Sequence, residues 1–349
     1  MSQPLRDITD LWTTPAAPSF IIAEVAQAHD GSLGSAHAYI DAVAKTGADA
    51  IKFQTHIAAE ESSDLDTWRV KFSRQDATRY DYWKRMEFTE PQWIELKQHA
   101  EEKGLVFLSS PFSLAAIRLL DRLNMAAWKV ASGEVTNRLF LDAMIATGKP
   151  VLVSSGMSYL EEMDATVALI KAAKSPVAVF QCTTAYPCPP EKIGLNQIAE
   201  LQARYGCPIG LSDHSGTPYP SLAAIALGAK LIEVHIAFSK EMFGPDTSAS
   251  LTTQDFAQMV EGIRFTEKML ASPTVKDDSA ATLEPLRKMF GQSLVAATDL
   301  PAGTLLTQEN LSCRKPGHGI SAASLESVLG KKLKHSVKAA QFLSADDFC

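Results

Sequence analysis

A repeated pairing of one short apolar run with one amphipathic segment dominates the sequence from Ser19 to about Met269. The apolar runs have the length and residue types of β-strands, and the amphipathic segments have apolar residues spaced for one face of a helix. Eight strands are predicted, over residues 20–24, 50–54, 106–110, 128–132, 151–154, 178–182, 209–214 and 231–235. Alternating strands and helices form a parallel sheet, and eight such units in about 250 residues are typical of a (β/α)8 TIM barrel.

A doubly wound open sheet is the alternative fold. Such a sheet would carry a glycine-rich dinucleotide turn after its first strand, but residues 24–31 contain no GxGxxG motif. A helix commonly ends in one residue with a left-handed backbone conformation, which glycine adopts most easily. Five of the predicted helices end at such a glycine just before the next strand: Gly47, Gly104, Gly148, Gly206 and Gly228. The barrel is therefore the predicted fold.

The periodic pattern ends near residue 270, which predicts three regions. Residues 1–270 form the barrel, and residues 271–285 are a linker. Residues 286–349 contain short apolar runs divided by prolines and glycines, which predicts a small β-rich domain. A core of this size is marginal alone, so we expect the domain to dock on the barrel or on a partner subunit.

Composition excludes several classes of protein. The 349 residues carry a net charge of −7, which argues against binding to nucleic acid or to an anionic membrane. No apolar stretch approaches the length of a membrane span, and the first residues lack the apolar core of a signal peptide. The five cysteines show no CxxC spacing, so they indicate neither a disulfide framework nor a structural zinc site. We expect a cytoplasmic protein.

Polar residues stand at the end of every predicted strand, where TIM-barrel enzymes place their chemistry. His214 and His235 end two consecutive strands and are candidate ligands for a divalent metal. Lys52 and Lys129, with serines and threonines, suit an anionic metabolite, and the carboxylates Glu24 and Glu134 could move protons.

Each of these residues also has a purely structural explanation. Either histidine could be a buried polar residue hydrogen-bonded to a loop, Lys52 could pair with a glutamate, and the serines could cap the following helices. The convergence of all eight strand ends favours a shared site. The long connection over residues 55–91, rich in aromatic and basic residues, is interpreted as a cover over that site.

Several motifs resemble the sialic acid synthase family. In the barrel they are IIAE (21–24), HDG (29–31), GADAIKFQT (47–55), SSPF (109–112), KVASGE (129–134), SSGM (154–157), CTTAYP (182–187), GLSDHS (210–215), EVH (233–235) and GPD (244–246). In the tail SLVA (293–296), DLPAG (299–303), ENL (309–311) and KPGHGI (315–320) resemble the antifreeze-like SAF domain that ends these synthases. The motifs cover nearly the whole chain in the family's order.

The resemblance implies that phosphoenolpyruvate condenses with the open-chain aldehyde of an N-acylated hexosamine such as N-acetylmannosamine, with release of phosphate. It also implies a divalent metal, Mn²⁺ or alternatively Mg²⁺ or Co²⁺, bound by His214 and His235. Glu24 is expected to transfer a proton to or from water or a hydroxyl group. The positions that match phosphoenolpyruvate-binding residues are Lys52, Ser110, Lys129, Ser132, Ser154 and Ser212. The positions that match residues near the sugar are Gln54, Glu134, Tyr186 and Asp246. A domain-swapped homodimer, in which the tail completes a neighbouring barrel, is also implied.

Three positions depart from the family's pattern. Thr184 stands where some members carry Asn beside the phosphate, and Thr247 follows GPD where members vary. The family's sugar-contacting Arg aligns with Lys315, and Arg314 lies one place early. Because Lys cannot reproduce a bidentate Arg contact, the acceptor could differ from N-acetylmannosamine.

Other functions stay open at this stage. Bacterial relatives make legionaminic or pseudaminic acid from 2,4-diacetamido-hexoses. A related phosphoenolpyruvate-dependent keto-sugar phosphate synthase would need a second phosphate-binding cluster of arginines, which is not evident in the sequence. A catalytically silent carbohydrate-binding protein would be expected to lack Glu24, a lysine or a metal-binding histidine, and all are present.

Overall fold

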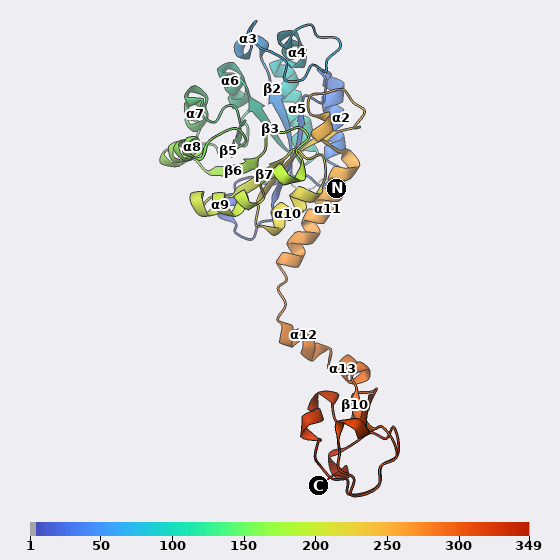
Figure 1. The fold of residues 1–349 in the computed structure, drawn as a ribbon. Helices are drawn as coiled ribbons and strands as arrows, with labels where there is room; N and C mark the ends of the chain where they lie inside the picture. Colours follow the sequence, from blue (N-terminus) through green and yellow to red (C-terminus); the bar gives the residue numbers. More distant parts are fainter. Residues whose placement is uncertain (1–4, 349) are drawn as a thin grey trace. The chain divides into compact units, whose positions relative to one another are not determined.

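The computed structural model describes residues 5–348, and the chain divides into two compact units at Ala271/Ser272. The first unit is a nearly closed barrel of eight parallel strands (Figure 1). The strands are β1 Phe20–Ala26, β2 Ala50–Thr55, β3 Val106–Pro111, β4 Trp128–Val130, β5 Val151–Ser154, β6 Val177–Cys182, β7 Ile209–Asp213 and β8 Leu231–Ala237. The predicted TIM-barrel fold is confirmed.

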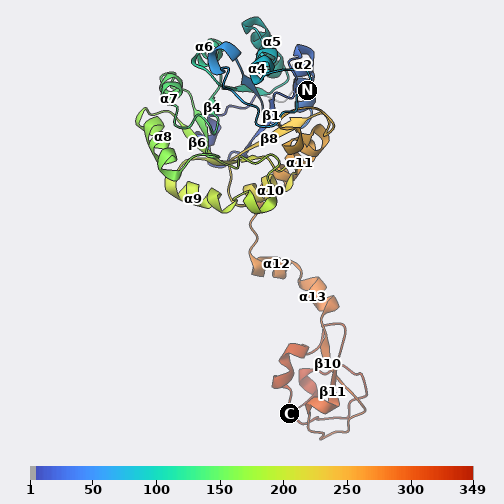
Figure 2. The same cartoon turned by 45° about the horizontal axis from the view of Figure 1, so that its top comes forward.

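Helices surround the strands, as the view along the barrel shows (Figure 2). They are α1 Asp10–Thr13, α2 Leu33–Val43, α3 Ala58–Glu61, α4 Arg79–Met86, α5 Glu90–Glu102, α6 Leu114–Arg122, α7 Arg138–Ile145, α8 Leu160–Ala172, α9 Asn196–Tyr205, α10 Tyr219–Ala226 and α11 Thr253–Leu270. A short strand, β9 Leu251–Thr252, pairs in parallel with the last residues of β8. Strands β3 and β4 are neighbours without a hydrogen-bonded ladder, so the barrel is not fully closed there.

The strand ends differ slightly from the prediction at both histidines. Strand β7 stops at Asp213, so His214 is the first residue beyond it, whereas β8 continues two residues past His235 to Ala237. Both imidazoles nevertheless lie at the carboxyl end of the barrel. Among residues 5–348 no helix is both long enough and apolar enough to cross a membrane.

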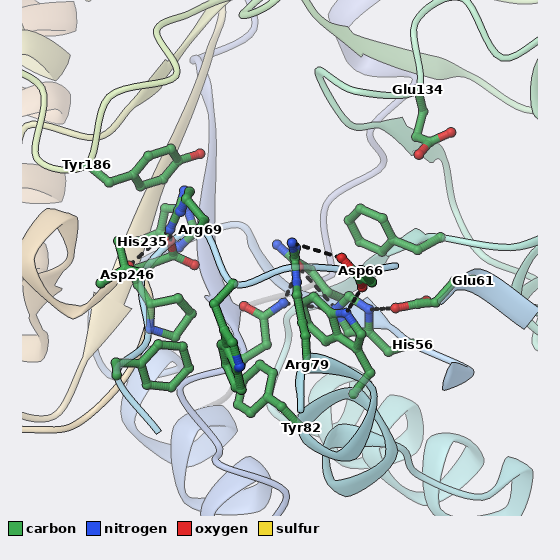
Figure 3. A pocket seen from close by; sticks show the side chains of 18 residues that line it. His56, Glu61, Asp66, Arg69, Arg79, Tyr82, Glu134, Tyr186, His235 and Asp246 are labelled. Carbon is green, nitrogen blue, oxygen red and sulfur yellow. Dashed lines mark hydrogen bonds and ion pairs between the residues drawn. The ribbon is translucent and has the colours of Figure 1, made fainter. Parts of the chain in front are cut away.

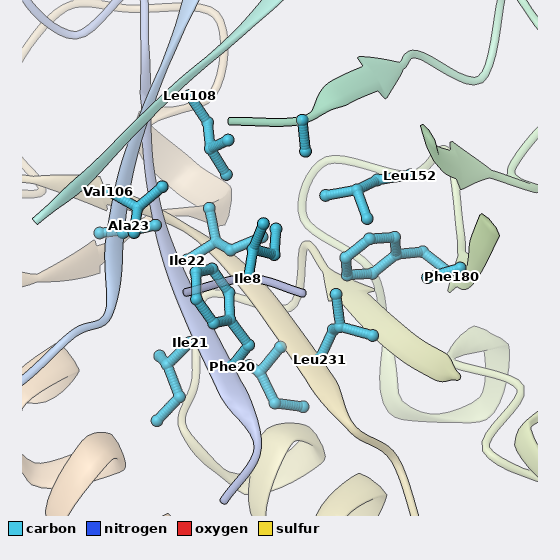
Figure 4. Packing of buried hydrophobic residues seen from close by; sticks show 14 of the residues in the cluster. Ile8, Phe20, Ile21, Ile22, Ala23, Val106, Leu108, Leu152, Phe180 and Leu231 are labelled. Carbon is cyan, nitrogen blue, oxygen red and sulfur yellow. The ribbon is translucent and has the colours of Figure 1, made fainter. Parts of the chain in front are cut away.

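Apolar side chains fill the base of the barrel interior, which is the part toward the amino-terminal ends of the strands. Ile22, Leu152, Phe180 and Leu231 converge there from four strands (Figure 4). Ile8 enters the same cluster from the segment that precedes β1 and is 2% exposed. Burial of this apolar surface is the main source of stability for the unit.

The segment before β1 is also held by polar contacts that the sequence did not indicate. Arg6 forms an ion pair with Asp49 at 3.0 Å, and Asp49 pairs as well with Arg264 of α11 at 2.7 Å. Trp12 Nε1 donates a hydrogen bond to the Val177 carbonyl at 3.0 Å. These contacts tie the N-terminal segment to both sides of the barrel base.

The second unit contains α12 Lys276–Thr282, α13 Glu284–Phe290 and an antiparallel pair, β10 Ser293–Ala296 with β11 Leu311–Arg314. Its core consists of Leu294, Ala296, Leu300, Leu306, Val328, Leu333, Val337, Leu343 and Phe348. Residues 271–285, predicted as a linker, contain α12. Acidic residues in the first turn of α12 favour a helix locally, although the helix buries none of its residues.

Gly210 of β7 tests how tightly the barrel interior is packed. A Cβ added there would lie 2.7 Å from two ring atoms of Phe180 and 2.8 Å from Leu231 Cβ. We expect Gly210→Ala to lower the free energy of unfolding by about 1–3 kcal/mol, measured by chemical denaturation. Gly34→Ala in α2 is the matched control. The new Cβ would have only Ser32 Oγ nearby, at 3.9 Å, so we expect a gain of about 0.5–1 kcal/mol. Equal effects at the two sites would contradict this account.

Candidate active site

Four charged side chains, Glu24, Lys52, Lys129 and Glu233, lie buried near the carboxyl ends of their strands. Their exposed fractions are 1%, 3%, 4% and 5%. Lys52 contacts Glu24 directly and lies 3.8 Å from Glu233 Oε1, while Lys129 Nζ lies 3.1 Å from the same oxygen. We call these residues the charge quartet. Buried charges are stable only when they are paired in this way.

Strand register explains why these side chains meet. Glu24 of β1 is the direct partner of Lys52 on β2 and of His235 on β8. Glu233 precedes His235 by two residues, so both side chains leave the same face of β8. Register thus accounts for Glu24, Lys52 and Glu233, whereas Lys129 reaches Glu233 from β4, a strand that is not paired with β8.

Serine hydroxyls complete the hydrogen bonds of the quartet. Lys52 Nζ donates to Ser110 Oγ at 3.2 Å, and Lys129 Nζ donates to Ser154 Oγ at 2.6 Å. Ser212 Oγ donates to Glu233 Oε1 at 3.2 Å. The other carboxylate oxygen of Glu233, Oε2, is buried without a hydrogen-bond partner among the described residues, so it is available to a bound group.

The two carboxylates of the quartet differ in proton affinity. Burial raises the pKa of Glu24, although the adjacent Lys52 ammonium opposes the change. Burial would also raise the pKa of Glu233, but the ammonium groups of Lys129 and Lys52 outweigh it and lower that pKa. Glu24 is therefore the carboxylate better suited to carry a proton, and Glu233 the one that stays ionised.

The two histidines lie side by side. The ring centroids of His214 and His235 are 5.2 Å apart, and His214 Nδ1 lies 2.9 Å from the Thr183 carbonyl oxygen. A carbonyl can only accept, so Nδ1 carries the proton and Nε2 keeps its lone pair. Burial, together with the neighbouring His235 ring, lowers the pKa of His214 to about 3, which keeps the ring neutral.

This pair can supply two of the ligands that a divalent metal requires. Neutral imidazoles are good ligands, and a carbonyl bonded to the far ring nitrogen is the usual support for a metal-binding His. No cluster of three or more His, Cys, Asp or Glu side chains that could hold a metal occurs among residues 5–348. A metal held here would thus have two protein ligands and would take its others from water and substrate.

Ser132, Thr184 and Cys182 surround a glycine beside the charge quartet. A Cβ on Gly156 would lie 2.6 Å from Ser132 Oγ, 2.7 Å from Thr184 Oγ1 and 3.1 Å from Cys182 Sγ. Ser132 Oγ lies 3.6 Å from Cys182 Sγ. The absence of a side chain at residue 156 lets two hydroxyl groups and the loop backbone approach one point, an arrangement that suits an anion's oxygens.

The remaining barrel residues from the sequence prediction line one cavity of about 410 Å³ (Figure 3). Gln54 Nε2 donates to Glu24 Oε1 at 3.2 Å, and the Tyr186 ring lies 4.2 Å from that of His214. Asp246 forms an ion pair with Arg69 at 2.8 Å. Glu134 lies apart from these groups, where it accepts a hydrogen bond from Asn137 at 2.7 Å.

Arg314 and Lys315 belong to the second unit, at the end of β11. Lys315 Nζ lies 5.3 Å from the ring centroid of Phe290, a cation–π contact within that unit.

Sequence reasoning missed Glu233 and the polar residues around the cavity. The signal for Glu233 was present, since it lies two residues before His235 in a predicted strand. Gln27, His56 and Arg69 come from connections, where no periodicity indicates the direction of a side chain.

Two family models match this chain. Residues 39–274 match the NeuB family, and residues 291–348 match the SAF domain. The chain belongs to the NeuB family. The predicted resemblance, in the barrel and in the tail, is confirmed.

Relatives of this NeuB-family chain differ in the products that their names state. It is 35% identical to human N-acetylneuraminate-9-phosphate synthase, with 94% of this chain and 92% of that one covered. It is 32% identical to the N,N'-diacetyllegionaminic acid synthase of Campylobacter jejuni, covering 90% and 95%. A pseudaminic acid synthase of the same species is also 32% identical, covering 94% and 96%. The chain is thus a NeuB-family synthase whose product the comparisons do not separate.

A solved structure supports the same grouping. The N-acetylneuraminic acid synthetase of Leptospira borgpetersenii, in complex with citrate, matches with a TM-score of 0.68 and 28% identity. The match covers 78% of this chain and 94% of that one.

The charge quartet makes a prediction about stability. Lys129→Met would leave Glu233 with Lys52 alone at 3.8 Å, so we expect the free energy of unfolding to fall by about 3–5 kcal/mol. Adding Glu233→Leu removes the carboxylate that has lost its partner and should restore part of the lost free energy of unfolding. A double-mutant cycle in urea would measure this. Arg122→Met is the control, because its pair with Glu90 is exposed and should change stability little. A strictly additive cycle would show that the quartet is not coupled.

Proposed function

We propose that this protein condenses phosphoenolpyruvate with the aldehyde of an N-acylated hexosamine and releases inorganic phosphate. The observation that carries the proposal is the pair of buried lysines, each bonded to a serine hydroxyl, in a barrel that also carries the paired rings of His214 and His235 at its carboxyl end. The named relatives that make nonulosonic acids add to this support.

In this reaction phosphoenolpyruvate carbon 3 forms a bond to the aldehyde carbon, and the aldehyde oxygen takes a proton. Water adds to carbon 2, and the bond between carbon 2 and the phosphate oxygen then breaks. The products are a nine-carbon 2-keto acid and phosphate. The chain must therefore bind an anion, orient a neutral aldehyde and handle the protons of water and hydroxyl.

Lys52 and Lys129 supply the charge that holds the anion. Each ammonium has three N–H donors, so an anion that lies between the two lysines can share these donors with Glu24, Glu233 and the serines. The hydroxyls of Ser132 and Thr184, gathered around Gly156, provide further donors. These contacts bring the phosphate and carboxylate groups to the barrel mouth.

Glu24 is the proposed proton carrier. It is buried against Lys52, and its carboxylate is oriented by Gln54. Its raised pKa lets it hold a proton near neutral pH more readily than an exposed glutamate would. Glu134, which lies apart across the cavity, is proposed to contact the sugar.

A divalent metal, Mn²⁺ in the first instance, would be held by Nε2 of His214 and by His235. When bound, it would polarise the aldehyde oxygen and so make the carbonyl carbon a better electrophile. Tyr186 packs against His214 and limits the freedom of its ring. The predicted homodimer, the contribution of Arg314 or Lys315 to a partner's site and the cytoplasmic location stay predictions from the sequence.

Phosphate release from phosphoenolpyruvate tests the function directly. We expect release only when an N-acylated hexosamine and a divalent metal are both present, and loss of release after chelation. His214→Ala should abolish calorimetric binding of Mn²⁺ as well as turnover, while the circular dichroism spectrum stays unchanged. A chelated enzyme that turns over at the full rate would exclude the metal, and no release with any amino sugar would exclude the function.

Glu24→Gln separates proton transfer from binding. The amide keeps the size and the contact with Gln54 but cannot exchange a proton at this position, so kcat should fall by about 10²- to 10⁴-fold. The KM for phosphoenolpyruvate should change much less. Glu134→Gln is the comparison, and we expect it to act mainly on the KM for the sugar. An unchanged kcat in Glu24→Gln would shift the proton role to Glu134.

A further inference from the structure

The cavity at the barrel mouth has a second wall that the proposed reaction does not use. Its lining from the connection between β2 and α5 consists of His56, Glu61, Asp66, Trp68, Arg69, Val70, Phe72, Arg79, Tyr82 and Trp83. We call this lining the connection wall. His56, Glu61, Asp66 and Arg79 of this wall lie across the cavity from Tyr186, His235 and Asp246, whereas Arg69 lies beside Tyr186 and Asp246 (Figure 3).

We propose that the connection wall binds the end of the acceptor sugar remote from its aldehyde. It selects a sugar that is acylated or deoxygenated at that end over one that carries hydroxyls there, and disfavours a phosphate at that end most of all. This inference rests on the proposed function, because it assigns the acceptor of the same reaction. It is carried by the aromatic surface of the wall, by its charge balance and by the position of Arg69.

Aromatic rings form a continuous surface on the wall. The Phe72 ring packs edge-on against Trp68 at 5.7 Å and against Tyr82 at 5.1 Å, and Tyr82 lies 5.1 Å from Trp83. The His56 ring stacks between Trp83 at 4.0 Å and Phe112 at 4.7 Å. These contacts hold the rings in place without a ligand, and such a preformed apolar surface suits methyl groups.

The charges of the cavity disfavour a phosphate. Its lining includes four carboxylates, those of Glu61, Asp66, Glu134 and Asp246, but only two guanidinium groups. The carboxylates of the lining therefore outnumber its guanidinium groups.

Both guanidinium groups are already neutralised. Arg79 pairs with Asp66 at 3.1 Å and donates to the Thr67 carbonyl at 2.8 Å, while Arg69 pairs with Asp246 at 2.8 Å. A phosphate dianion here would have to displace these carboxylates and would be repelled by those that remain.

Arg69 is placed to bind a neutral oxygen. Its guanidinium carbon lies 4.3 Å from the Tyr186 ring centroid, and Nη2 donates to Asp246 and to the Pro245 carbonyl. Among the described residues Nε and Nη1 have no acceptor, which leaves donors for an acyl carbonyl or a hydroxyl. The ion pair with Asp246 also connects the connection wall to the loop after β8. Arg69 therefore holds these two parts of the cavity lining together.

An acceptor panel tests the substrate class with the full-length protein. The panel contains N-acetylmannosamine, its 6-phosphate and a 2,4-diacetamido-2,4,6-trideoxyhexose, with phosphate release from phosphoenolpyruvate as the readout. We expect kcat/KM for the diacetamido sugar to exceed that for N-acetylmannosamine by roughly 10-fold or more. We expect kcat/KM for the 6-phosphate to be lower than that for N-acetylmannosamine by about 10-fold or more.

Equal or faster turnover of the 6-phosphate, or a preference for N-acetylmannosamine over the diacetamido sugar, would overturn the inference and leave the proposed function standing. No release with any of the three would reject the proposed function, and this inference with it.

Arg69→Gln tests the residue. With the diacetamido sugar we expect its KM for the acceptor to rise roughly 10- to 100-fold while its KM for phosphoenolpyruvate stays near that of the wild type. Arg69→Lys should recover only part of the loss, because an ammonium cannot reproduce the planar contacts.

Arg74→Gln is the matched control, since Arg74 is exposed on the same segment and contacts Phe243 outside the cavity lining. It should leave both KM values unchanged. An unaltered acceptor KM in Arg69→Gln, or an equal change in Arg74→Gln, would remove Arg69 from the acceptor site.

Discussion

The pairing of buried charges in the barrel is the interaction on which the rest of the site depends. Four ionisable groups buried within one barrel are tolerated only because each has a group of opposite charge as a neighbour. The parallel register of β1, β2 and β8 brings Glu24 beside both Lys52 and His235. A shift of one residue in that register would turn these side chains to the helical side of the sheet and leave them unpaired there. The geometry of the site is therefore a consequence of correct barrel closure.

The polarity of the barrel interior changes along the barrel axis. Toward the base, Ile8, Ile22 and Phe180 make a dry apolar layer, whereas the mouth carries the charge quartet and its serines. The apolar layer excludes water from below, which strengthens the electrostatic interactions of the lysines above it. Stability and chemistry thus use different layers of the same strands.

The sequence predicted the barrel and most of the strand-end residues, because apolar periodicity and the carboxyl-end rule both depend on local order. The eight predicted strands all exist, and Lys52, Lys129 and Ser154 lie where strand alternation directs them. Glu233 was not predicted as part of the site, since its role comes from cross-strand neighbours that the sequence does not indicate. The helix α12 also escaped prediction, and the connection over residues 55–91 was predicted only as a cover over the site, because neither segment has a periodic pattern that indicates where its side chains point.

A chain of hydrogen bonds links the connection wall to the reacting end of the site. Glu61 contacts the His56 ring at 2.7 Å, and Gln27 Nε2 contacts both His56 Nε2, at 2.9 Å, and Gln54 Oε1. Gln54 in turn donates to Glu24 at 3.2 Å. The Gln54 amide can satisfy both neighbours only with its oxygen toward Gln27 and its nitrogen toward Glu24. Contacts on the acceptor side therefore set the orientation of the carboxylate proposed to carry the proton, so binding of the sugar and proton transfer share one hydrogen-bonded path.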